Sequence, residues 1–153
     1  MSFGIILVII IDGITATIAR LMPKKVADYN KKIFLVSRNE KNFYNRLKIK
    51  KWKEKVPEIG CFTGFRKNEV LEPKNPEYVN RFLMEICYGE IGHFASIFTG
   101  FILLFLNWFN PYWLPLCWVI VIVNAILNIL PIMVLRYNSY SLVLIKKRLE
   151  YKL

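Results

Sequence analysis

The basic residues of this chain are concentrated in one stretch and missing from another. Of the 22 Lys and Arg residues, 17 lie between Arg20 and Arg81, none lies from Phe82 to Leu135, and 5 follow from Arg136 onward. The chain is nevertheless 55% hydrophobic, with a formal net charge of +11. Long apolar segments between basic ones are typical of membrane-spanning helices separated by charged loops. The sequence therefore predicts an all-α fold, an integral membrane helical bundle.

Three apolar segments are long enough to cross a bilayer, which needs about 20 residues of helix. The predicted spans cover residues 3–20, 91–109 and 112–135, and a basic loop covers residues 23–76. Basic residues follow the first apolar segment and do not precede it, which favours a retained span over a cleaved signal peptide. We expect a single membrane domain over residues 1–153.

The helix that contains the second span is predicted to begin near Asn75 or Pro76. Proline is favoured at the first position of a helix, and Glu77 is favourable in the first turn. Nothing in the sequence breaks this helix before Asn107, and Asn110-Pro111 indicates a turn before the third span.

The distribution of basic residues also predicts topology and partners. Lys and Arg are enriched in cytoplasmic loops, so we expect a multi-pass cell-membrane protein with its N-terminus outside and its C-terminus cytoplasmic. Apolar residues between Lys24 and Lys55 recur at helical spacing, which predicts an amphipathic helix at the cytoplasmic surface. Anionic lipid head groups account for this basic charge, and no nucleic-acid-binding motif accompanies it.

Three ionisable residues lead into the second span. On a helix, Glu85, Glu90 and His93 project to one side, and Glu90 and His93 are neighbours at i, i+3. A carboxylate that contacts an imidazole prepares it as a general base, so His93, oriented by Glu90, is the candidate catalytic group. The alternative is a polar helix end at head-group level with no chemistry.

A metal site is not expected. Glu-x-x-His recurs in di-iron helix bundles, but those sites need a second copy of the motif, which this chain lacks. The three cysteines, Cys61, Cys87 and Cys117, have no paired spacing of the kind found in zinc sites.

Asp12 lies in the middle of the first span, where a carboxylate needs partners. Arg136, His93, Asn124 and Asn128 are the candidate partners. A structural pairing of Asp12 and a role in the site both remain open at this point.

Three segments resemble the glycosyl-4,4'-diaponeurosporenoate acyltransferase family, which contributes to staphyloxanthin-type pigment synthesis. They are Trp52-Lys53-Glu54-Lys55-Val56-Pro57, Glu85-Ile-Cys-Tyr-Gly-Glu90-Ile-Gly-His93-Phe94 and Arg136-Tyr137-Asn138. Their order and spacing are similar to those of the family's motifs, over roughly residues 34–142. Tyr88, Gly89 and Phe94 stand where the family has Arg, Ala and Trp, and residues 139–141 replace Arg-Pro-Arg.

The resemblance implies a membrane-embedded acyltransferase that moves a fatty acyl group onto a hydroxyl of a glycolipid or isoprenoid-glycoside acceptor. It implies catalytic roles for His93, Glu90 and Glu85, without a cofactor and with acyl-CoA or another acyl donor as co-substrate. The residues expected to bind substrate are Arg136, Tyr137, Asn138, Asn128, Trp52, Lys53 and Asp12.

Two other functions are compatible with the same residues. One is a non-catalytic membrane subunit or lipid-binding scaffold, in which His93 is packed shut or points into solvent. The other is a different lipid-modifying membrane enzyme on the same scaffold. In each case we expect membrane lipids as partners, and three short helices leave homodimerisation open.

Overall fold

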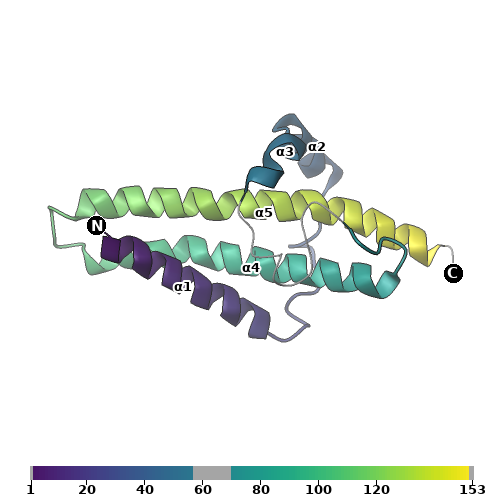
Figure 1. Cartoon of the computed structure of the whole chain (residues 1–153), viewed down its shortest axis with the longest axis horizontal. Coiled ribbons are helices and arrows are strands. Elements are labelled where there is room, and N and C mark those ends of the chain that lie inside the picture. Colours follow the sequence, from purple (N-terminus) through teal and green to yellow (C-terminus); the bar gives the residue numbers. More distant parts are fainter. Residues whose placement is uncertain (1, 57–69, 152–153) are drawn as a thin grey trace.

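The computed structural model describes residues 2–56 and 70–151, and these residues form helices and connecting turns without a β-strand (Figure 1). The elements, in chain order, are α1 (Ser2–Leu21), α2 (Arg38–Arg46), α3 (Ile49–Trp52), the 3₁₀ helix η1 (Lys53–Lys55), α4 (Pro76–Leu106) and α5 (Leu114–Glu150). The expected all-α fold is confirmed. Residues 57–69 of the predicted basic loop lie outside the described residues.

The start of α4 is determined by its capping residues. The Asn75 side chain accepts hydrogen bonds from the backbone N–H groups of Glu77 and Tyr78, at 3.0 and 3.2 Å. Pro76 occupies the first turn, where its missing N–H would have no partner in the helix. The predicted start of this helix is therefore confirmed.

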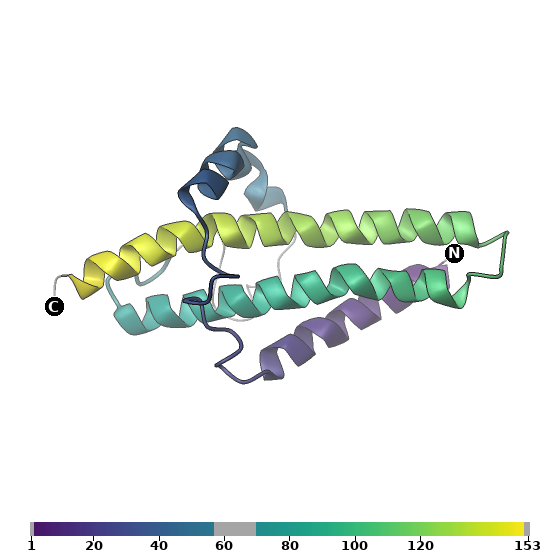
Figure 2. The same ribbon diagram turned by 180° about the vertical axis from the view of Figure 1, so that it is seen from behind.

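α4 and α5 form an antiparallel hairpin that runs the length of the molecule (Figures 1 and 2). At 1.5 Å per residue the two helices are about 46 and 55 Å long. Both are long and apolar enough to cross a membrane. In the turn between them, the Asn110 side chain accepts from the backbone N–H groups of Tyr112 and Trp113. The expected turn at Asn110-Pro111 is thus present.

The hairpin buries its apolar core in two places. Near the end that holds the C-terminus, Leu142 of α5 packs on a patch of α4. That patch consists of Val79, Phe82, Leu83 and Ile86. Near the turn, Leu104 of α4 packs against Cys117 and Val121 of α5. The polar groups of the hairpin lie between these two clusters.

α1 packs along the half of α4 that is nearer the α4–α5 turn (Figure 2). A Cβ added at Gly92 would lie 3.4 Å from Ala16 Cα and 3.7 Å from Ala19 Cβ, in van der Waals contact, so a side chain larger than alanine has no room there. Small residues at such crossings are a common device for close packing of apolar helices. The predicted span over residues 3–20 thus forms a helix, and its crossing of the membrane stays a prediction.

The single amphipathic helix expected between Lys24 and Lys55 is not formed. Residues 22–37 are mainly turns, and helix begins only at Arg38, where the Ser37 hydroxyl accepts from the Glu40 N–H at 3.1 Å. Lys48 then adopts a left-handed conformation, with φ of 54°, and separates α2 from α3. The two helices fold onto α5 instead of lying along one line.

Tyr44, Ile49 and Val56 form the buried contact of this segment with Val134 of α5. Of the apolar positions in the predicted helix, Ile49 is buried, whereas Ile33, Phe43 and Leu47 are exposed. The apolar residues between Lys24 and Lys55 are therefore divided among turns and short helices and do not form one apolar face.

We expect Gly92→Val to destabilise the bundle by roughly 1–3 kcal/mol, because the added methyl groups would push α1 away from α4. Gly13→Val is the matched control, since a Cβ at Gly13 meets nothing within 4 Å. Denaturation in mixed micelles, followed by tryptophan fluorescence, measures the difference. Equal stability of the two variants would contradict the packing described for α1.

Candidate functional site

The polar side chains of the hairpin lie in three successive layers along α4 and α5. Nearest the turn, Asn124 donates to the backbone oxygen of Ser96 at 2.9 Å. In the middle layer, His93 contacts Asn128. In the third, Glu90 contacts Arg136. Each layer is a direct contact between α4 and α5, so the antiparallel register brings these residues together.

Arg136 has the largest set of polar contacts in the third layer. Its Nε and Nη2 donate to the two carboxylate oxygens of Glu40, at 2.6 and 3.1 Å. Its Nη1 donates to Glu90 Oε2 and to the backbone oxygen of Ile33, both at 2.9 Å. The guanidinium therefore joins α5 to α4, to α2 and to the segment before α2. Four of its five N–H groups are used in these contacts.

Glu40 is a charged acceptor in this layer. Burial raises the pKa of its carboxyl, but hydrogen bonds from Arg136 and Tyr44 outweigh that effect and hold the pKa below its ordinary value. The Tyr44 hydroxyl donates to Glu40 Oε1 at 2.6 Å. Burial and this bond to a carboxylate raise the pKa of Tyr44 to about 12. Glu40 thus stays ionised and Tyr44 stays neutral at physiological pH.

His93 makes its hydrogen bond to Asn128 on the opposite helix. The distance between His93 Nδ1 and Asn128 Oδ1 is 2.9 Å. Asn128 Nδ2 faces acceptors only: Asp12 Oδ2 at 3.3 Å, and the backbone and side-chain oxygens of Asn124 at 3.0 Å each. The amide orientation follows, because Nδ2 must donate to these oxygens and Oδ1 must accept from His93.

The tautomer of His93 follows from the same network. Since Asn128 Oδ1 can only accept, Nδ1 of the neutral imidazole carries the proton and Nε2 carries the lone pair. No hydrogen bond from the described residues reaches Nε2, and the side chain is only partly buried. The imidazole is therefore held in the form that a general base requires.

Asp12 lies on α1 at the same level. It accepts from Asn128 Nδ2 and, through Oδ1, from the Thr99 hydroxyl at 2.9 Å. Of the partners considered from the sequence, Asn128 is confirmed as a direct one. Thr99 was not foreseen. The carboxylate lies one amide away from the imidazole, so it holds Asn128 and adds negative charge behind His93.

Glu85, Glu90 and His93 contact different parts of the protein. Glu85 lies 3.5 Å from Arg20 of α1, Glu90 bonds Arg136, and His93 bonds Asn128. The expected orientation of His93 by Glu90 is therefore corrected, because Asn128 makes that contact. The register of the two helices explains this, since it brings an amide to the imidazole and a guanidinium to the carboxylate. Glu90 Oε1 is buried without a hydrogen-bond partner among the described residues.

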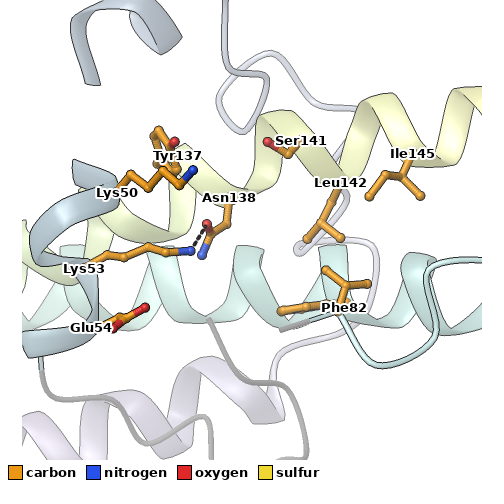
Figure 3. Close-up of a pocket in the computed structure, with 10 residues that line it drawn as sticks. Lys50, Lys53, Glu54, Phe82, Tyr137, Asn138, Ser141, Leu142 and Ile145 are labelled. Atoms are coloured by element: carbon orange, nitrogen blue, oxygen red, sulfur yellow. Dashed lines mark hydrogen bonds between the residues drawn. The ribbon is translucent and has the colours of Figure 1, made fainter. Parts of the chain in front are cut away.

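Three of the remaining expected substrate-binding residues lie at a cavity of about 350 Å³ beyond the third layer (Figure 3). Tyr137 and Asn138 of α5 line it, and Lys53 of η1 donates to Asn138 Oδ1 at 3.4 Å. Trp52 has a different position: its indole N–H donates to the backbone oxygen of Leu47 at 3.0 Å, and its ring packs beside the Tyr44 cluster.

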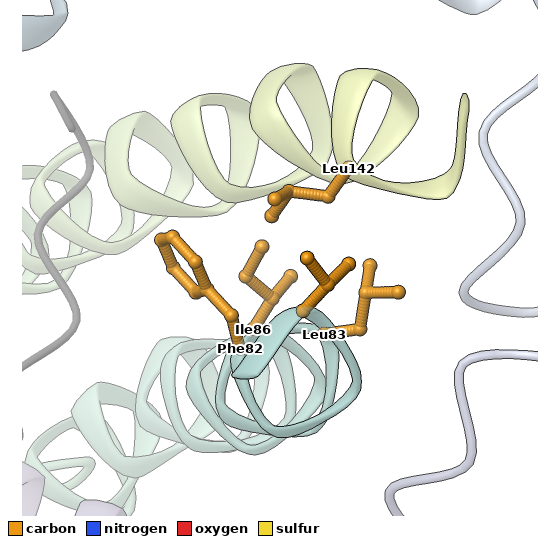
Figure 4. Close-up of a cluster of buried hydrophobic side chains, with 5 residues drawn as sticks. Phe82, Leu83, Ile86 and Leu142 are labelled. Atoms are coloured by element: carbon orange, nitrogen blue, oxygen red, sulfur yellow. The ribbon is translucent and has the colours of Figure 1, made fainter. Parts of the chain in front are cut away.

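The wall of the cavity formed by Phe82 and Leu142 belongs to the buried cluster between α4 and α5 (Figure 4). The hairpin thus contributes an apolar wall together with the polar side chains of Asn138 and Ser141, whereas α3 and η1 contribute charged side chains.

Sequence reasoning missed Glu40, Lys41 and Lys50, which all contribute to these layers or to the cavity. One local signal was available for Glu40. Ser37 and Glu40 have the Ser-x-x-Glu spacing of a helix N-terminus, and Glu40 is the one acidic residue between Asp28 and Glu54. An acidic residue isolated in a basic segment is a candidate partner for a distant arginine.

We expect Arg136→Gln to cost roughly 3–5 kcal/mol of stability, because it leaves the buried carboxylate of Glu90 without its partner. Adding Glu90→Gln should recover part of that loss. The control is Arg20→Gln, whose partly exposed pair should contribute less than about 1 kcal/mol. Micelle denaturation of the four proteins gives the comparison, and an Arg136→Gln loss no larger than that of Arg20→Gln would contradict it.

In the comparisons with known proteins, the chain matches one protein-family model. A protein-family model described as CrtO, glycosyl-4,4'-diaponeurosporenoate acyltransferase, matches residues 25–148. Searches of curated proteins and of solved structures found no match. The matched region contains the three polar layers except Asp12, together with the cavity. The chain therefore belongs to the glycosyl-4,4'-diaponeurosporenoate acyltransferase family.

Proposed function

We propose that this protein is a membrane-embedded acyltransferase that moves a fatty acyl group onto a hydroxyl of a glycolipid or isoprenoid-glycoside acceptor. The family supports an acyl transfer in carotenoid synthesis. The hydrogen bond between His93 Nδ1 and Asn128 Oδ1 is the observation that carries the mechanism. It leaves Nε2 as a base without a partner among the described residues.

In this mechanism His93 Nε2 takes the proton of the acceptor hydroxyl as its oxygen attacks the acyl carbonyl carbon. A tetrahedral intermediate forms, and its collapse breaks the bond to the donor's leaving group. The imidazolium returns the proton to that group, and the new ester remains on the acceptor. Asn128 plays the orienting part that an asparagine plays in Cys-His-Asn sites, and Asp12 holds Asn128.

Glu90 has a supporting role in this proposal. Its Oε2 is engaged by Arg136, while the buried Oε1 has no partner among the described residues. Glu90 and His93 are neighbours on one helix face. Glu90 Oε1 accepts a hydrogen bond from a hydroxyl of the acceptor and so positions the sugar at His93. Arg136 holds Glu90 in place and has one N–H group left for an oxyanion.

Exposed apolar surface supports the membrane location. On α1, five isoleucines are each more than half exposed: Ile6, Ile9, Ile10, Ile14 and Ile18. On α4, Phe94, Phe98 and Phe105 are exposed by 61%, 58% and 81%. Such continuous apolar faces are costly in water and favourable in lipid. We propose a three-span arrangement in which α1, α4 and α5 cross, with an outer N-terminus and a cytoplasmic C-terminus.

The alternative of a non-catalytic subunit predicts that His93 is packed shut or points into solvent. His93 is instead partly buried, with one ring nitrogen bonded across the helix interface. This arrangement favours a catalytic function over that of a non-catalytic subunit.

The test is to express the chain in a host that makes the glycosylated carotenoid acid and to measure its acylated product by mass spectrometry. His93→Ala should lower product formation at least about a hundredfold, the usual contribution of a general base. Product that does not depend on His93 would rule out the mechanism.

Substitution of Asn128 provides a second test of the proposed His93–Asn128 pair. Asn128→Leu removes the acceptor for Nδ1–H and should lower the turnover rate with little effect on the apparent KM for acceptor. Glu90→Gln should mainly raise that KM, because a neutral amide holds a sugar hydroxyl less well. Thr17→Val, which changes an exposed side chain of α1 bonded only to its own helix, is the control. Equal kinetics for Asn128→Leu and wild type would remove Asn128 from the mechanism.

A further inference from the structure

The cavity beside α3 has cationic side chains on one wall. Figure 3 shows Lys53 extending from η1 to Asn138 and Lys50 extending from α3 toward Tyr137, both on α5, with Ser141 further along the same helix. The opposite side is apolar and is formed by Phe82, Leu142 and Ile145. A volume of about 350 Å³ is large enough for a small charged group with part of an attached chain.

The charge around this cavity is predominantly positive. Two lysines and one glutamate, Glu54, line it. Lys41 of α2 adds a third cation, because its Nζ donates to the backbone oxygen of Tyr137 at 2.8 Å and to Ser141 Oγ at 3.5 Å. Both residues line the cavity. The three ammonium groups and the single carboxylate leave an excess of positive charge.

The lysines also repel one another. Burial, and then the charge of Lys53, lower the pKa of Lys41 to about 8. Lys41 also lies 3.2 Å above the centre of the Tyr137 ring and 5.6 Å from that of Tyr140, so two aromatic rings and Ser141 face it. An anion placed between Lys41 and Lys53 would relieve this repulsion.

The donors suit an anion with several oxygens. Ammonium groups approach from α2, α3 and η1, and the Ser141 hydroxyl approaches from α5. A phosphate offers oxygens in several directions and up to two negative charges, so it can satisfy such a set. A carboxylate offers only two oxygens in one plane.

The position of the cavity limits which class of acyl donor can place a phosphate there. Asn138 is ten residues after Asn128 on α5, which corresponds to about 15 Å along the helix. In a glycerophospholipid or an acyl phosphate, the phosphate lies only a few bonds from the acyl carbonyl. A phosphate in the cavity and a carbonyl at His93 therefore require a long linker between them.

We propose that this cavity binds the phosphate of the acyl donor, and that the donor is a thioester carried on an extended, phosphate-bearing pantetheine chain. The apolar wall contacts that chain on its way to His93. This inference rests on the proposed acyl transfer, and it assigns the donor side of the reaction to Lys50, Lys53 and Ser141.

The experiment uses the full chain in nanodiscs of phosphatidylcholine, with coenzyme A as a soluble, unreactive probe in isothermal titration calorimetry. Lys53→Gln should weaken binding about tenfold, the value of one charge-assisted hydrogen bond. Lys53→Arg should retain most of the affinity. Lys24→Gln removes the same charge from an exposed position away from the cavity, and should bind as wild type does.

Two further arms separate the sources of phosphate. Pantetheine, which has no phosphate, should bind at least tenfold more weakly than coenzyme A. Coenzyme A binding that is equal in wild type and Lys53→Gln overturns the proposal. If coenzyme A does not bind but phosphatidylglycerol binds in a Lys53-dependent manner, the cavity holds a lipid head group and the extended donor is overturned.

A final variant keeps this inference distinct from the proposed function. His93→Ala should bind coenzyme A with wild-type affinity while it loses acylated product, because His93 lies in a different layer. Lys53-dependent binding together with product that is independent of His93 would support the phosphate site and refute the proposed base.

Discussion

The guanidinium of Arg136 joins three segments that are far apart in the sequence. It bonds Glu90 on the facing helix, Glu40 on α2, and the backbone of Ile33 before α2. Removing a buried carboxylate from water is costly unless a charged partner with good geometry compensates it. The arginine therefore sets where the basic segment can attach to the hairpin. The cavity exists between that segment and α5 because this attachment holds.

Much of the hairpin was predictable because its signals are local. Asn75 and Pro76 determine a helix start through bonds within the next three residues, and Asn110 likewise forms a local turn by accepting from the Tyr112 N–H. The apolar stretch between them appears directly in the sequence. The family resemblance also indicated His93 and Arg136 as candidate site residues without any knowledge of their partners.

The partners could not be predicted because they depend on the register between helices. Glu90 and His93 are close along one helix, yet each bonds a different residue of α5, and no spacing rule within α4 reveals this. The prediction of a single helix in the basic segment was wrong for another reason. Apolar spacing predicted one helix, but Lys48 takes a left-handed backbone conformation that a lysine adopts only when tertiary contacts favour it.

The hairpin is covered by different elements over its two halves. α1 reaches the half that contains His93, through Asp12 and the Gly92 contact, whereas α2 and α3 lie on the half that contains the cavity. Changes in one covering element leave the contacts of the other intact. Under the function proposed above, substitutions in α2 and α3 would alter the donor side of the site and leave the acceptor side unchanged, and the reverse would hold for α1.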